Sequence, residues 1–188
     1  MSKEDAQRWN RRYLEDQRFQ EPIYPKSFLV EHADLLPMKG IALDVAMGLG
    51  GNAAFLIDHG LRVVGVDISD VALRKARARL PQLMAVRADL TNFSLSVNSF
   101  DVILNFYFLK RTLWTAFRRW LRPGGLLIIE TLLQEMRECQ PGIDPAYLLE
   151  PGELKEAFSD LEMLVYREGW EKSAQGRPRA VASLIARL

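Results

Sequence analysis

The segment 41–52 combines an acidic residue with closely spaced glycines. Asp44 lies within the apolar run 41–45, and Gly48 and Gly50 follow it just before a helical stretch. Glycine allows a backbone to approach a ligand closely, and the free amide groups at the start of the next helix attract an anion. This combination indicates a loop that contacts a nucleoside or nucleotide.

Two more acids end the next two β-rich runs. Asp67 follows run 62–66, where its carboxylate can accept two hydrogen bonds from a ribose diol, each worth about 1.5–3 kcal/mol because the acceptor is charged. Asp89 follows run 83–88, where it can accept a hydrogen bond from an adenine amino group while Leu90 shields the ring. The three acids therefore predict a site for a molecule that contains adenosine.

The position of Asp44 separates two kinds of ligand. A dinucleotide site has small residues before its glycines and places a pyrophosphate on the following helix. Asp44 lies four residues before Gly48, where it would repel a pyrophosphate but could hold the ammonium group of an amino acid. We therefore favour a nucleoside joined to an amino acid, and an enzyme that uses nicotinamide is the alternative.

Strands that alternate with helices are needed to bring these acids together. The predicted strands are followed by helices at 51–59, 70–80 and 111–121, a pattern typical of right-handed crossovers and a mostly parallel sheet. A helix is predicted at 153–158, and the last two runs have no helix between them, so they are expected to form an antiparallel hairpin at one edge. The predicted strands cover 41–45, 62–66, 83–88, 100–105, 126–131, 161–166 and 180–187.

The remaining segments complete a single predicted domain, 1–188. Helices at 3–19 and 26–36 form a helical cap over 1–38, and the α/β core covers 39–188. The connection 132–150 shows no clear periodicity, and loops of this length are usually functional or disordered, so we expect a lid on the substrate side.

Composition excludes several classes of protein. The chain has 188 residues, with 25 Lys and Arg against 24 Asp and Glu, and Cys139 is its one cysteine. This balance argues against a nucleic-acid partner bound through phosphate charge, and one cysteine allows neither an internal disulfide nor a cysteine-based metal site. The sequence shows neither a signal peptide nor an apolar run of about 20 residues, so we expect a cytoplasmic protein that does not insert into a membrane. We expect no metal site, and the sequence leaves open whether the protein is a monomer or a homodimer.

Segment 44–50 (Asp-Val-Ala-Met-Gly-Leu-Gly), with Asp67, Asp89 and segment 121–125 (Leu-Arg-Pro-Gly-Gly), resembles the class I S-adenosylmethionine-dependent methyltransferases over most of the chain. The resemblance implies a Rossmann-like, doubly wound sheet of seven strands with helices on both faces, and S-adenosylmethionine as cofactor. It places Gly48 and Gly50 at the methionine part, Asp67 at the ribose and Asn105 near the sulfonium. The candidate cofactor residues are Asp44, Ala46, Met47, Gly48, Gly50, Asp67, Ile68, Asp89, Leu90, Asn105, Trp9, Arg12 and Tyr13.

A helix at the start of the chain adds the last three of these candidates. Trp9 and Tyr13 lie on one face of helix 3–19, where they can contact the sulfonium through a cation–π interaction worth about 0.5–2 kcal/mol if the helix folds over the cleft. An aromatic pair at this spacing also commonly packs a helix onto a core. Arg12 can pair with the carboxylate of the cofactor.

A narrower resemblance concerns the acceptor. Segments 127–131 and 144–154 are similar to the tellurite-resistance and thiopurine-type detoxification branch, although Ala46, Met47 and Asp144 depart from its pattern. We expect the reacting centre at 105–111, which holds aromatics, an amide and two cations but neither a carboxylate nor a histidine. The absence of an obvious general base favours a small soft nucleophile such as a thiol, selenium or tellurium species.

Three residues are candidates for contact with this small acceptor: Tyr107, Arg111 and Glu130. Arg111 is expected to favour an anionic acceptor, because a nearby cation raises the ionised fraction of a thiol. Two alternatives stay open besides the nicotinamide enzyme. One is an RNA or protein methyltransferase, which the basic helix 70–80 would serve, and the other is a non-catalytic nucleoside-binding module.

Overall fold

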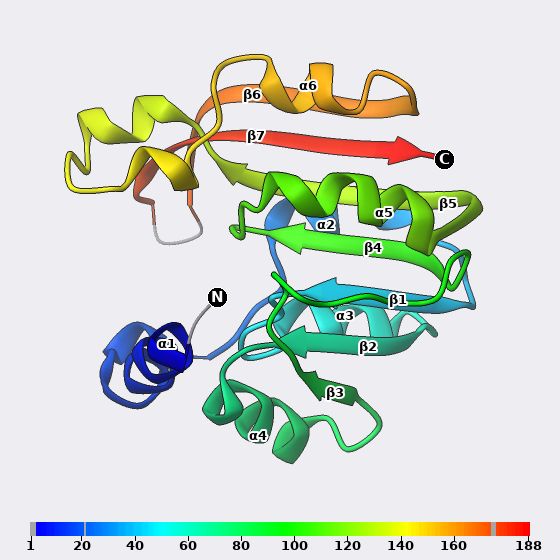
Figure 1. Ribbon diagram of the computed structural model, residues 1–188, viewed down its shortest axis with the longest axis horizontal. Helices are drawn as coiled ribbons and strands as arrows, with labels where there is room; N and C mark the ends of the chain where they lie inside the picture. Colours follow the sequence, from blue (N-terminus) through cyan, green and yellow to red (C-terminus); the bar gives the residue numbers. More distant parts are fainter. Residues whose placement is uncertain (1–2, 21, 174–175) are drawn as a thin grey trace.

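The protein is built around one mixed sheet of seven strands in the order β3-β2-β1-β4-β5-β7-β6. The computed structural model describes residues 3–20, 22–173 and 176–188 (Figure 1). The first five strands are parallel, and β7 lies antiparallel between β5 and β6, which confirms the predicted sheet and its hairpin. The strands are β1 Ile41–Val45, β2 Arg62–Asp67, β3 Met84–Arg87, β4 Phe100–Phe106, β5 Leu121–Leu132, β6 Glu162–Lys172 and β7 Pro178–Arg187.

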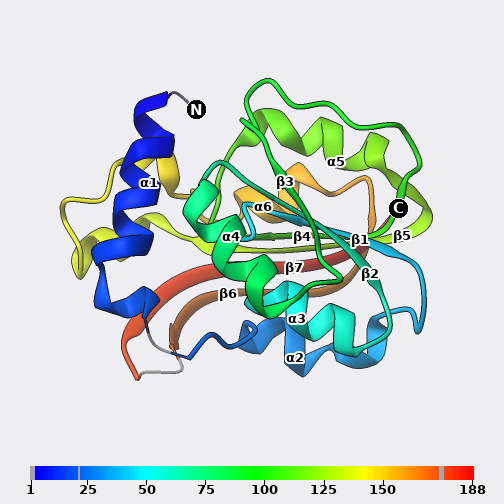
Figure 2. The same cartoon turned by 90° about the horizontal axis from the view of Figure 1, so that it is seen from below.

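Helices cover both faces of the sheet, as predicted (Figure 2). On one face, α2, α3 and α4 share a buried cluster with residues such as Phe28, Leu56 and Leu73. On the other face, Phe117 of α5, Leu154 of α6 and Phe158 just after α6 belong to a second cluster. The helices are α1 Lys3–Glu15, α2 Ser27–Glu31, α3 Gly51–Asp58, α4 Asp70–Arg79, α5 Trp114–Trp120 and α6 Glu153–Ala157.

The strand order reverses between β1 and β4, because β2 and β3 extend the sheet on one side of β1 and the later strands extend it on the other. Ligands of open α/β sheets bind beyond the carboxyl ends of the strands at such a point. Figure 1 shows α1 beyond the carboxyl ends of β1 and β2, on the side where this crevice opens. The topology therefore brings the ends of β1, β2 and β4 together next to α1.

Several predicted boundaries were wrong. The helix predicted at 26–36 is two short pieces, α2 and the 3-10 turn Ala33–Leu35, because the backbone leaves helical geometry at His32 with φ −118°. Phe28 and Leu29 are fully buried in the layer over the sheet, so this part of the expected cap belongs to the core. The helix predicted at 3–19 ends at Glu15 and is followed by the 3-10 turn Gln17–Phe19.

The later elements differ in the same way. The helix predicted at 111–121 starts as the 3-10 turn Arg111–Leu113. Strand β5 begins at Leu121, before the predicted 126, since Leu121 pairs with Phe100 ahead of an irregularity in the register. Both strands of the final hairpin are longer than predicted, because their pairing continues as far as Lys172 opposite Pro178.

The segment 132–150 is not an irregular loop. It contains the 3-10 turns Gln134–Glu138 and Pro145–Tyr147, and a bridge joins Leu133 to Leu149. Met136 and Leu148 are buried in the same cluster as α5 and α6, which fixes the segment to the core. None of its residues lines the cavity described below, so the structure does not support the predicted lid.

The contact between β2 and the loop after β1 generates a test of packing. A methyl group on Gly65 would overlap the Sδ atom of Met47, whose side chain is buried over this strand. We expect Gly65→Ala to lower the free energy of unfolding by about 1–3 kcal/mol, as overpacking does.

Chemical denaturation of Gly65→Ala, Met47→Ala and the double variant measures this contact. The double variant is expected to lose less stability than the sum of the two single variants, because the shorter side chain makes room for the methyl group. Gly142→Ala is the control, since nothing lies within 4 Å of its added Cβ. Additive losses would show that the two residues do not share this space.

Candidate active site

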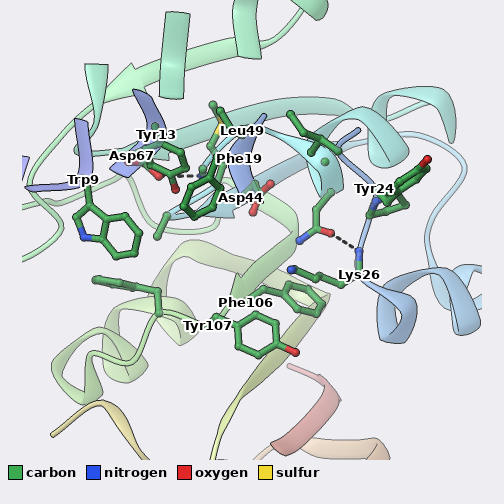
Figure 3. Close-up of a pocket in the computed structure, with 18 of the residues that line it drawn as sticks. Trp9, Tyr13, Phe19, Tyr24, Lys26, Asp44, Leu49, Asp67, Phe106 and Tyr107 are labelled. Carbon is green, nitrogen blue, oxygen red and sulfur yellow. Dashed lines mark hydrogen bonds between the residues drawn. The ribbon is translucent and has the colours of Figure 1, made fainter. Parts of the chain in front are cut away.

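A cavity of about 420 Å³ opens at the carboxyl ends of β1, β2 and β4. Its volume lies within the range of about 300–1,000 Å³ that is usual for small-molecule sites. Figure 3 shows Asp44, Asp67 and Tyr13 on one side of it, and Lys26, Phe106 and Tyr107 on the other. Nine of the predicted site residues line it: Trp9, Tyr13, Asp44, Ala46, Met47, Gly48, Asp67, Ile68 and Tyr107.

Asp67 ties the end of β2 to the loop after β1. Its Oδ2 accepts the backbone N–H of Gly48 at 2.8 Å, and its Oδ1 accepts that of Ser69 at 2.8 Å. Burial raises the pKa of Asp67, and the amide donors, including that of Ile68, oppose this rise. A carboxylate has about four acceptor positions, so both oxygens keep capacity for the hydroxyl groups of a ribose.

The loop after β1 has a backbone that few residues tolerate. Ala46 and Gly48 have φ values of +54° and +57°, in the left-handed region. A Cβ on Gly48 would lie 2.8 Å from the Tyr13 hydroxyl oxygen, so the glycine is also needed to admit the tyrosine. Strained conformations of this kind concentrate at binding sites, where the backbone must come close to a ligand.

Asp44 is buried at the end of β1, with 1% of its surface exposed. Burial raises its pKa to about 7, the negative charge of Asp67 adds to this effect, and the Ala53 N–H and Lys26 oppose it. Its Oδ2 atom has no hydrogen-bond partner among the described residues. A buried carboxylate with a free oxygen on a cavity wall is suited to receive a cationic group from a ligand.

The helix α1 forms the outer wall of the cavity. Trp9 and Tyr13 line the cavity, and they also pack with Leu49 and Val71 in a small cluster over the start of α4. The Asn10 side chain accepts a hydrogen bond from the Ser69 hydroxyl at 2.7 Å, which holds α1 in place. The two interpretations of the aromatic pair, as packing and as ligand wall, are thus compatible.

Tyr107 directly follows β4 and has a strained backbone with φ +56°. Its hydroxyl donates to Glu130 Oε1 at 2.5 Å, and its N–H donates to the Glu130 carbonyl oxygen at 2.8 Å. Burial raises the pKa of the Tyr107 phenol, and the charge of Glu130 adds to the effect. Glu130 itself is fully buried and does not line the cavity, so it supports Tyr107 from behind.

The structure places Arg111 elsewhere and corrects its predicted role. Its Nη2 bonds Glu153 Oε2 at 2.7 Å and the Leu148 carbonyl oxygen at 3.0 Å. These residues lie at a separate surface hollow between α5 and α6. Arg111 therefore ties α6 and the segment before it to the turn after β4, and it does not line the cavity.

Five predicted cofactor residues also lie outside the cavity wall. Asp89 accepts the N–H and hydroxyl of Thr91 and caps a turn after β3, and Leu90 is buried in the core. Asn105 is buried, and its Oδ1 atom has no partner among the described residues. Gly50, with φ +77°, precedes the first turn of α3, and the Arg12 guanidinium lies over the Trp9 ring at 4.6 Å.

Sequence reasoning missed several residues of the cavity wall. Lys26 and Asn52 come from the segment before α2 and from α3, and Arg179 comes from the start of β7. The Lys26 N–H donates to Asn52 Oδ1 at 2.9 Å, and a Cβ on Gly51 would lie 2.5 Å from the Tyr24 carbonyl oxygen. No local signal marks these residues, because packing of distant segments brings them to the site.

Comparison with known proteins identifies the fold. Residues 42–125 match a family model described as a methyltransferase domain. The chain is 33% identical over 111 residues to phosphoethanolamine N-methyltransferase from Triticum aestivum, a match that covers 53% of this chain and 22% of that protein. The matches cover between 22% and 38% of the length of the curated relatives.

Solved structures agree with this assignment. TehB from Haemophilus influenzae has a TM-score of 0.71 at 15% identity, with 95% of this chain and 66% of that one covered. Geranyl diphosphate C-methyltransferase from Streptomyces coelicolor A3(2), solved with S-adenosyl-L-homocysteine, has a TM-score of 0.70 at 13% identity, with 98% and 97% covered. The fold is that of the class I S-adenosylmethionine-dependent methyltransferases.

Two absences hold for the residues that the structure describes. None of their helices is long and apolar enough to cross a membrane. They also contain no group of three or more His, Cys, Asp or Glu residues arranged to hold a metal ion.

The buried Asp44 predicts a dependence of stability on pH. Its pKa is about 7 in the folded chain against 3.8 for an unperturbed group, so wild-type stability is lost as pH rises through about 7. A pKa change of one unit is worth about 1.4 kcal/mol, so Asp44→Asn should stabilise the unliganded protein by up to about 4 kcal/mol at pH 8 and by little at pH 4. Thermal unfolding at both pH values measures this difference.

Asp58→Asn serves as the control for Asp44, because this side chain is exposed at the end of α3. Its effect on Tm should not change between pH 4 and pH 8. A Tm of Asp44→Asn below that of wild type at pH 8 would show that the buried carboxylate does not destabilise the folded protein.

The left-handed loop after β1 generates a second prediction. The substitutions Gly48→Ala and Gly124→Ala, at φ values of +57° and +78°, should each lower the free energy of unfolding by about 1–2 kcal/mol through backbone strain. Gly48→Ala should lose more stability than Gly124→Ala, because the added Cβ meets Tyr13 at the first position and nothing within 4 Å at the second. Equal losses in chemical denaturation would remove the contact with Tyr13 as a cause.

Proposed function

We propose that this chain is an S-adenosylmethionine-dependent methyltransferase that acts on a small, soft nucleophile. The observation that carries the proposal is one cavity in which Asp44, Asp67 and the Gly48 backbone face the space beyond β1 and β2. The matched methyltransferase domain, 42–125, contains all three. The fold supplies the rest of the argument, because such sheets bind their ligands at this switch point.

The described residues fit the cofactor. The free Oδ2 of Asp44 is available to the ammonium of the methionine part, and the Asp67 carboxylate to the ribose hydroxyls. Gly48 lines the cavity without a side chain, and a Cβ there would collide with the Tyr13 hydroxyl. The aromatic rings of Trp9 and Tyr13 line the cavity and suit the cationic sulfonium, and the Arg12 guanidinium lies over the Trp9 ring outside the cavity wall.

Bound S-adenosylmethionine supplies an electrophilic methyl group for an in-line displacement. The chain contributes alignment and exclusion of water. Phe106, Phe108 and Tyr107 form an apolar wall next to the acids, and α1 closes the outer side. These residues align the methyl donor with the acceptor, and none of them needs to carry a charge in the displacement.

The class of methyl acceptor is inferred from the groups in the cavity that could remove a proton. No histidine lines the cavity in the part of the chain that the structure describes, and its carboxylates are Asp44 and Asp67, which the cofactor needs. The Tyr107 hydroxyl already donates to Glu130, and its raised pKa keeps the phenol protonated, so the basic phenolate is not available. A thiol, selenium or tellurium species that reacts as an anion requires no base, which favours it over an amine or alcohol.

The basic helix α4 does not favour an RNA acceptor. Lys75 donates to the Tyr13 carbonyl oxygen at 2.7 Å, Arg79 donates to that of Leu49, and Arg74 pairs with Asp70 at 2.5 Å. The first two bonds tie α4 to α1 and to the loop after β1. Three of the four cations of α4 therefore have partners within the protein, and the fourth, Arg77, is exposed.

Calorimetry with S-adenosylhomocysteine and NAD⁺ tests the cofactor. We expect S-adenosylhomocysteine to bind and NAD⁺ not to bind. Asp67→Asn should weaken the affinity for S-adenosylhomocysteine at least tenfold, since a charged acceptor bond is worth about 1.5–3 kcal/mol. Asp70→Asn, three residues further on the surface of α4, should keep the wild-type affinity.

Labelled S-adenosylmethionine then tests the acceptor, with a panel of thiols, selenite, tellurite, small amines and bulk RNA. Transfer to thiols, selenium or tellurium species is the expected result. Transfer to amines or RNA alone would contradict the proposed acceptor class, and binding of NAD⁺ alone would contradict the cofactor.

A further inference from the structure

Lys26 is a cation in the cavity wall that the proposed chemistry does not use. The residue lies just before α2, and its backbone is fixed by the bond from its N–H to Asn52. Its Nζ atom lies 4.9 Å from the centre of the Tyr107 ring. Figure 3 shows the Lys26 side chain extended toward Phe106 and Tyr107, on the side of the pocket opposite Asp67.

A second cation lies near the same ring. The guanidinium carbon of Arg179 is 5.3 Å from the centre of the Tyr107 ring. The ring is held between backbone and side-chain bonds to Glu130, so it cannot turn away from the two cations without breaking them. Lys26, Tyr107 and Arg179 thus form one fixed group, called the cationic subsite below.

The arginines at and behind the cationic subsite have carboxylate partners of their own. Arg179 pairs with Glu171 at 2.7 Å and with Glu130 at 3.8 Å. Arg167 pairs with the same two carboxylates at 3.4 and 3.8 Å, and with Glu31 at 2.8 Å. Lys26 makes no ion pair with any residue that the structure describes, so its ammonium is the cation that remains available to a ligand in the cavity.

An unpaired ammonium in this position is costly to the protein alone. Burial lowers the pKa of Lys26, the charge of Arg179 lowers it further, and Glu130 and Asp44 oppose this effect. A ligand that brings one negative charge would offset the loss of hydration and gain a charge-assisted hydrogen bond. A single charge matches a carboxylate better than a phosphate dianion.

We propose that the cationic subsite binds a carboxylate of the acceptor, so that the acceptor is a small organic acid that also bears the nucleophilic atom. The inference rests on the proposed function and specifies its substrate class. The cofactor occupies the side of Asp44 and Asp67, and the acid binds on the opposite side of the same cavity. Phe106 and Tyr107 lie on the same side of the cavity as Lys26, opposite Asp67 (Figure 3).

Two thiols of similar size test the proposal: 3-mercaptopropionate, which carries a carboxylate, and 2-mercaptoethanol, which does not. Methylation of both is measured with wild type, Lys26→Met and Lys39→Met at saturating S-adenosylmethionine. Lys39 is the matched control, because it is exposed at the opposite end of β1. Methionine keeps much of the apolar stem and removes only the charge.

We expect wild type and Lys39→Met to prefer the acid at least tenfold in kcat/KM. Lys26→Met should abolish this preference through a rise of at least tenfold in KM for 3-mercaptopropionate, with the affinity for S-adenosylhomocysteine within twofold of wild type. Equal use of both thiols by wild type, or an unchanged KM in Lys26→Met, would overturn the proposal. A tenfold loss of S-adenosylhomocysteine affinity would assign Lys26 to the cofactor and also overturn it.

Failure of the proposed function is distinguishable from failure of the subsite. If S-adenosylhomocysteine binds and neither thiol is methylated, the soft nucleophile is wrong. Binding of the two thiols, measured by saturation-transfer NMR with and without S-adenosylhomocysteine, then decides about the subsite. A tenfold tighter Kd for the acid that disappears in Lys26→Met supports it, and equal Kd values overturn it.

Discussion

The hydrogen bond from the Gly48 N–H to the Asp67 carboxylate is the interaction on which the site depends. It joins the loop after β1 to the end of β2, and it holds that loop in a left-handed backbone at Ala46 and Gly48. The space over Gly48 admits the Tyr13 hydroxyl, so the same residue positions α1. One bond thus couples the sheet, the ligand loop and the outer wall of the cavity.

The site also contains two ionisable side chains, Asp44 and Lys26, whose burial does not stabilise the fold. Asp44 is buried with one oxygen that has no hydrogen-bond partner among the described residues, and Lys26 lines the cavity without an ion pair among them. Each group loses hydration, and a ligand with complementary charge would recover part of that loss. Asp44 and Lys26 lie on different sides of the cavity (Figure 3). This arrangement suits a cationic cofactor on one side and an anionic acceptor on the other.

Glu130 shows how a buried acid can serve a site without touching its ligand. Its oxygens accept bonds from Tyr107 and Ser183, and Arg167 and Arg179 lie at 3.8 Å. These contacts hold Tyr107 in its strained conformation at the end of β4. The sequence pattern marked Glu130 as a candidate contact for the acceptor, whereas the structure assigns it to the support of the aromatic wall.

Local pattern was sufficient for the sheet, its hairpin and the cofactor side of the cavity. Strand periodicity, the glycines after β1 and the acids at strand ends are short-range features, and parallel strands necessarily bring their carboxyl ends to one edge. The acceptor side was decided by tertiary structure. Lys26 and Arg179 lie far apart in the sequence and meet at Tyr107 only because β7 enters beside β5 and α2 packs under the sheet, while Arg111, close to Tyr107 in sequence, turns away to Glu153. Contacts between distant segments depend on how whole elements pack, and that information is not contained in the spacing of neighbouring residues.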